Sequence, residues 1–61
     1  MVQLSEKELS ALNDTLNEEE LLVKKFKMLA THSQDEEVKC KFEEISNRHQ
    51  DHFNMLYKQL G

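Results

Sequence analysis

The chain has 61 residues, with 8 basic and 12 acidic side chains and a formal net charge of -4 at pH 7. One hydrophobic core of this size rarely contributes more than about 3–5 kcal/mol, so we expect a single domain over residues 1–61 that self-association or a ligand helps to stabilise. The acidic balance disfavours nucleic acid and anionic membranes as partners. No apolar run approaches the length of a secretory signal or a membrane span, so we expect a chain that is made and kept in the cytosol.

Residues that interrupt helices are almost missing from the chain. It contains no proline, and its single glycine is Gly61, which suits a helix terminus. The composition therefore predicts an all-α fold. Cys40 is the only cysteine, which excludes an intramolecular disulfide and fits a reducing compartment.

The first predicted helix runs from about Ser5 to Thr31. Ser5 and Glu8 have the spacing of a capping box, in which each side chain accepts a hydrogen bond from the backbone of the other. Apolar residues then recur at helical spacing and predict a buried seam along one side of the helix. The seam consists of Leu9, Leu12, Leu16, Val23, Phe26 and Ala30.

An acidic run interrupts this seam in the middle of the first helix. Glu19 occupies the seam position itself, with Glu18 and Glu20 on either side. Glu20 can also pair with Lys24 one turn later. A small rotation of the helix changes which of the three residues faces inward. We therefore expect at least one of the three carboxylates to face inward, and all three remain candidates.

The polar segment 32–35 predicts a turn between two helices, in which Ser33 or Asp35 can cap the second helix. That helix is expected from about Glu36 to Leu60. Its apolar stripe reads Val38, Phe42, Ile45, His49, His52 and Leu56. Two imidazoles thus stand at positions where core residues belong, and a buried imidazole needs a partner for each ring nitrogen.

A short loop between two helices of similar length predicts an antiparallel hairpin, in which residues that meet have position numbers with a constant sum. The seams satisfy a sum of 68 for Phe26 with Phe42, Val23 with Ile45, Leu16 with His52, and Leu12 with Leu56. Glu19 with His49 has the same sum. We therefore expect the interrupting carboxylate to lie opposite a histidine.

A second apolar stripe remains after the hairpin is formed. It comprises Leu21, Leu22, Met28 and Leu29 in the first helix and Phe53, Tyr57 and Leu60 in the second. Two helices cannot cover both stripes, so we expect two hairpins to form a homodimeric four-helix bundle.

The chain resembles the ferritin-like superfamily, and more closely the small spore coat proteins of the coat-protein-F type found in endospore-forming Firmicutes. The residues that carry the resemblance are Glu19–Phe26, Ala30, Asp35, Val38–Lys39, Phe42, His49–Asn54 and Leu60. The resemblance implies a ferritin-like bundle, in which the first helix offers a glutamate and the second a Glu-x-x-His motif. Two such helix pairs build a di-iron or di-manganese carboxylate site in those families.

Matched to that pattern, Glu19 or Glu20 is the glutamate of the first helix and His52 is the histidine of the motif. His49 stands where the family has a glutamate. A neutral imidazole neither bridges two metals nor supplies negative charge, so the remaining set suits zinc or a single iron ion better than an oxygen-activating pair. In the alternative interpretation the chain binds no metal, and glutamate and water satisfy both histidines.

Three classes of function follow. The first is a structural or interaction protein of the spore coat, located in the mother cell or the coat, with itself and other coat proteins as partners. The second is a metal-binding ferritin-like protein with a modified di-metal site. A di-metal oxidase comes last, because the carboxylates that it needs are missing and the sequence contains no other catalytic constellation.

Overall fold

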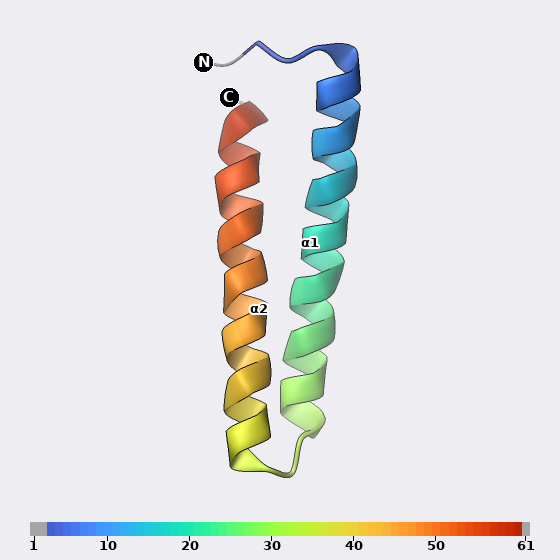
Figure 1. The fold of residues 1–61 in the computed structure, drawn as a ribbon. Coiled ribbons are helices and arrows are strands. Elements are labelled where there is room, and N and C mark those ends of the chain that lie inside the picture. Colours follow the sequence, from blue (N-terminus) through green and yellow to red (C-terminus); the bar gives the residue numbers. More distant parts are fainter. Residues whose placement is uncertain (1–2, 61) are drawn as a thin grey trace.

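The computed structural model describes residues 3–60 and consists of two antiparallel helices joined by a short turn (Figure 1). Helix α1 spans Glu6–His32, helix α2 spans Glu36–Tyr57, and a single 3₁₀ turn, η1, covers Lys58–Leu60. The predicted all-α hairpin is confirmed. Gly61, the expected terminus of the second helix, lies outside the described residues.

Both helices begin with a side-chain cap. The Ser5 hydroxyl accepts a hydrogen bond from the backbone N–H of Glu8 at 3.1 Å, and the Glu8 carboxylate accepts one from the backbone N–H of Ser5 at 3.0 Å. The capping box is therefore confirmed. Of the two residues proposed to cap the second helix, Asp35 does so, because its Oδ1 accepts from the N–H of Val38 at 3.0 Å.

The second helix ends slightly earlier than expected. It was predicted to continue to Leu60, but regular α-helical geometry stops at Tyr57. The N–H of Lys58 is shared between the carbonyl oxygens of Asn54 and Leu56. The last turn is thereby tightened into 3₁₀ geometry, which is common where an α-helix ends.

The helices pack in the predicted register. The rings of Phe26 and Phe42 lie with their centroids 6.0 Å apart, as expected for two residues whose numbers add to 68. The buried residues are Leu16, Val23, Ala30 and Ser46. Ser46 was not predicted to be buried, yet it is only 1 % exposed, and its hydroxyl donates a hydrogen bond to the carbonyl oxygen of Val23 at 3.2 Å.

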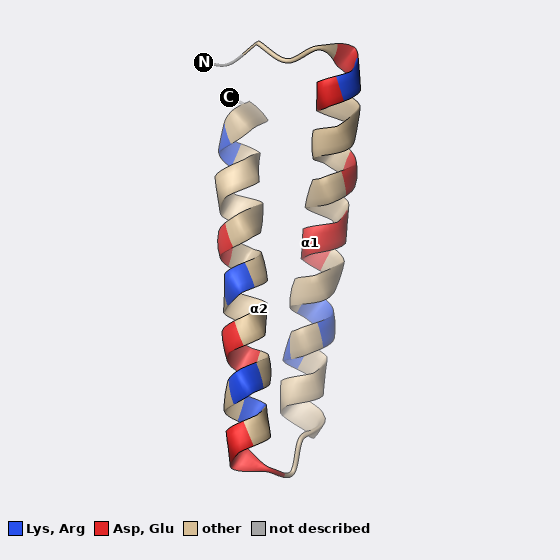
Figure 2. Ribbon diagram, in the orientation of Figure 1, with Lys and Arg blue, Asp and Glu red and all other residues tan. Residues whose placement is uncertain are grey.

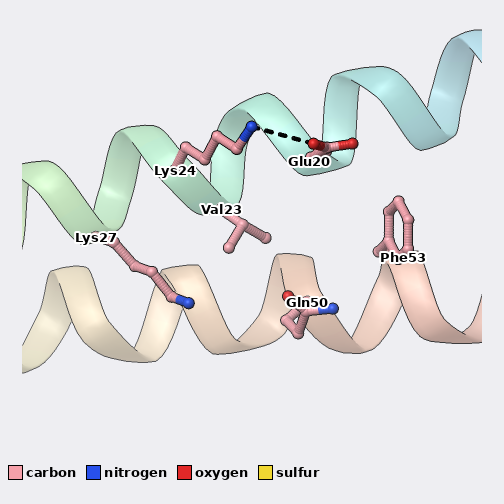
Figure 3. Close-up of a pocket in the computed structure, with 6 residues that line it drawn as sticks. All are labelled: Glu20, Val23, Lys24, Lys27, Gln50 and Phe53. Carbon is pink, nitrogen blue, oxygen red and sulfur yellow. Dashed lines mark ion pairs between the residues drawn. The ribbon is translucent and has the colours of Figure 1, made fainter.

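The hairpin has two broad faces, which follow from a rotation of about 100° per residue along each helix. On one side lies a row that we call the bundle face: Leu22, Phe26, Leu29, Val38, Ile45, His52 and Leu56. The opposite side, the groove face, is marked by a shallow groove lined by Glu20, Val23, Lys24, Lys27, Gln50 and Phe53 (Figure 3).

These two faces divide the predicted second stripe. Leu22 and Leu29 are half-buried on the bundle face, whereas Phe53 lies on the groove face. The ring of Phe53 stacks on that of Tyr57, with the ring centroids 5.8 Å apart. Leu21 is 65 % exposed and points away from α2. The second stripe is therefore not one surface, because residues one position apart on a helix differ by more than a quarter of a turn.

Basic and acidic side chains are interspersed along both helices (Figure 2). Within residues 3–60, no helix is long and apolar enough to cross a membrane.

Candidate metal centre

Three side chains from the two helices converge near the middle of the hairpin: Glu19 of α1 with His49 and His52 of α2. Each offers one potential ligand atom, and these atoms all lie within 4.8 Å of one another. The side chains of Glu19 and His49 are 14 % and 22 % exposed, whereas that of His52 is 52 % exposed. The cluster is thus enclosed by the hairpin on one side and open on the other.

Glu19 and His49 form the enclosed part of the cluster. Because an ionised carboxylate can only accept hydrogen bonds, Nδ1–H of His49 donates to Oε2 of Glu19, at 2.9 Å. The His49 ring also stacks on Phe26, with a centroid distance of 5.8 Å and an interplanar angle of 15°. Carboxylate and aromatic ring together hold the imidazole in one orientation. Phe26 was predicted to lie in the core, but its orienting contact with His49 carries no signal in the sequence pattern.

His52 approaches the same carboxylate from the open side. Its Nδ1 lies 3.5 Å from Oε2 of Glu19, and its ring meets that of His49 edge-on at 5.8 Å. Both histidines lie on the predicted stripe of α2, but to different depths. His49 is largely enclosed, whereas the position of His52 is rotated toward the bundle face and half of its side chain is exposed within one hairpin.

The other two carboxylates of the acidic run do not join the cluster. Glu20, predicted from the sequence as a metal ligand in alternative to Glu19, lies on the groove face, where its carboxylate pairs with the Lys24 ammonium at 3.1 Å (Figure 3). That ion pair was predicted and is confirmed. Glu18 is exposed on the other side of Glu19. The rotation of α1 therefore assigns Glu19 alone to the inward position.

The two distances from the Glu19 carboxylate to the imidazoles are close to those of a zinc site, and all three ligand atoms lie within 4.8 Å of one another. Two ligands at about 2.0–2.1 Å from a tetrahedral zinc ion lie roughly 3.3 Å from each other. The contacts of Glu19 with His49 and with His52, at 2.9 and 3.5 Å, bracket that separation. One carboxylate and two imidazoles form a three-ligand set of a kind that leaves at least one coordination position open.

Comparison of the chain with models of protein families, with curated proteins and with solved structures finds no match.

Proposed function

We propose that this chain is a small structural and interaction module of the spore-coat type, which pairs with a second copy of itself in a four-helix bundle. The observation that supports this proposal is the bundle face, a row of largely apolar side chains that the hairpin covers only in part. Each helix can cover only one stripe of the other, so a second hairpin is needed to enclose this face. The assignment to a spore coat follows from the family resemblance.

The size of the hairpin supports the same conclusion. Its buried apolar residues are Leu16, Val23 and Ala30, which is a small core for a chain of this length. The hairpin measures 45 × 16 × 11 Å, so its broad face is comparable in area to the roughly 800 Å² per partner of a standard interface. A second copy would therefore add a core at least as large as the one already present.

The charges beside the bundle face favour one arrangement of the two copies. Glu18 and Lys25 flank this face on α1, and Glu44 and Arg48 flank it on α2; all four are exposed. In the observed register, Arg48 lies within two residues of the level of Glu18, and Glu44 lies within one of Lys25.

A two-fold axis parallel to the helices would place α1 of one copy over α2 of the other, bringing Glu18 toward Arg48 and Lys25 toward Glu44. A perpendicular axis at the level of the cluster would instead bring Glu18 toward a second Glu18. Of these two arrangements, only the parallel axis brings Glu18 toward an opposite charge, and we adopt it.

Sedimentation equilibrium at micromolar concentrations tests the assembly. The wild-type chain of 7.2 kDa should sediment as a dimer. Leu22→Glu places a charge on the bundle face and should shift the equilibrium to monomer, with loss of helix. Leu21→Glu adds the same charge at the neighbouring position, which points outward, and should remain dimeric. A cooperatively folded wild-type monomer would contradict the proposal.

The coat role is tested by location. In the source organism, a fluorescent fusion should collect at the periphery of the developing spore. An even distribution through sporulating cells would contradict the coat role and leave the proposed interaction module unaffected.

A second candidate function is metal binding by a ferritin-like protein with a modified di-metal site. The cluster of Glu19, His49 and His52 favours it. Elemental analysis of the purified protein tests it, since a metal at a fixed ratio to the chain supports this function and substoichiometric traces contradict it.

A further inference from the structure

We infer that metal binding and assembly are linked in this protein. Glu19, His49 and His52 of each hairpin hold one divalent transition-metal ion, and the bound ion strengthens the pairing of two hairpins. This inference rests on the proposed function, because it requires the bundle face to receive a second copy. It differs from the carboxylate-bridged metal pair that the family resemblance implies, since all three donors of one ion come from a single hairpin.

The donors are arranged for an ion before any partner arrives. Nδ1 of His49 and Nδ1 of His52 both lie close to the same oxygen, Oε2 of Glu19, at 2.9 and 3.5 Å. The stack of His49 on Phe26 and the burial of Glu19 keep two of the three donors in place. Two imidazoles with one carboxylate suit zinc and iron(II), whereas magnesium and calcium prefer oxygen donors.

The open side of this site coincides with the bundle face. His52 is the most exposed of the three donors, and its apolar neighbours on that side of α2 are Ile45 and Leu56. An ion held there would be covered on one side by its own hairpin and exposed on the other. The second hairpin would cover that exposed side.

The parallel two-fold axis keeps both clusters at the same level of the bundle. It places α1 of the second copy, which carries that copy's Glu19, over the α2 that carries His49 and His52. The Glu19 of that second copy stays with its own His49, so its α1 covers the open side without adding a fourth donor. With less water around it, the ion would be held more tightly in the dimer than in a single hairpin.

A ligand that binds the dimer more tightly than the monomer must also strengthen the dimer, by thermodynamic reciprocity. Saturating zinc should therefore lower the dimer dissociation constant by about tenfold or more.

The test combines sedimentation equilibrium with calorimetric titration of the full chain, in chelator-treated buffer, with zinc chloride and with magnesium chloride as the control ion. His52→Ala removes a half-exposed donor and should still fold, but should lose both zinc binding and the zinc-dependent gain in dimer affinity. Glu19→Gln should behave in the same way. The matched controls His32→Ala and Glu20→Gln alter an exposed histidine and the neighbouring carboxylate, and should respond to zinc as the wild type does.

Each outcome separates the linkage from the proposed function. A wild-type dimer whose dissociation constant is the same with zinc as with chelator would overturn the linkage and leave the interaction module standing. Unchanged zinc binding in His52→Ala would overturn the donor set. A chain that remains monomeric with and without zinc would overturn both proposals.

Discussion

The hydroxyl of Ser46 donates a hydrogen bond to the backbone carbonyl oxygen of Val23 across the helix interface, at 3.2 Å. A side chain that is 1 % exposed and bonded to the facing backbone marks a place where the two helices approach closely. A larger residue would not fit there without separating them.

Substitutions at Ser46 should therefore depend on size more than on polarity. Ser46→Ala should cost about 0.5–1.5 kcal/mol for the lost hydrogen bond, whereas Ser46→Leu should cost about 1–3 kcal/mol through overpacking. Urea denaturation of the metal-free protein measures both. Ser10→Leu, at an exposed position of α1, is the control and should leave stability nearly unchanged. Equal effects of Ala and Leu at position 46 would show that the helices are not closely packed there.

The pairing of Glu19 with His49 should matter most when one partner is removed alone. In chelator, His49→Ala should destabilise the hairpin by about 1–3 kcal/mol, because it leaves a largely buried carboxylate without its donor. The double variant Glu19→Leu with His49→Leu should recover most of that loss, since it makes both apolar seams continuous. Thermal unfolding followed by circular dichroism checks both variants. His32→Ala, in the last turn of α1, should have no measurable effect.

The capping box predicts a particular response to acid. Hydrogen bonds from the backbone N–H and then the side chain of Ser5 lower the pKa of Glu8 below its ordinary value of 4.5. A carboxylate with a lowered pKa contributes stability above its ordinary value and loses it as the pH falls through the lowered one. The stability difference between wild type and Glu8→Ala should therefore be largest near neutral pH and shrink below 4.5.

Glu6→Ala, which removes a carboxylate of the first turn outside the capping box, controls for charge alone. Denaturant unfolding from pH 7 to pH 3 provides the comparison. A difference for Glu8→Ala that stays constant down to pH 3 would show that the charge of Glu8 plays no part in the cap.

Exchange of charges tests the orientation of the two copies. Glu18→Arg and Arg48→Glu should each weaken the dimer several-fold, because each places like charges opposite one another, whereas the double variant should recover much of the affinity. Sedimentation equilibrium at low and at high salt measures this cycle, and the effects should diminish at high salt. Single variants that leave the affinity of the dimer unchanged would favour the perpendicular axis, because like charges already face each other in that arrangement.

Much of the fold could be predicted from local patterns. Ser5 with Glu8 determines where α1 begins, and Asp35 determines where α2 begins, because each side chain satisfies backbone N–H groups that would otherwise lack partners. Because the turn is short, residues at equal distances from it along the two helices face each other. For this reason both the Phe26–Phe42 contact and the Glu19–His49 contact could be predicted from the sequence alone.

The rotation of each helix about its axis could not be predicted in the same way, and only the tertiary structure decided it. Apolar residues at spacings of three and four define the inward-facing positions of a helix only to within one residue. An error of one residue corresponds to a rotation of about 100° about the helix axis. That uncertainty left Glu18, Glu19 and Glu20 as alternatives and combined Leu22 with Phe53 in one stripe. Packing resolved both, because with Ser46 against Val23 the Glu19 side chain faces inward and Phe53 lines the groove on the opposite side from Leu22.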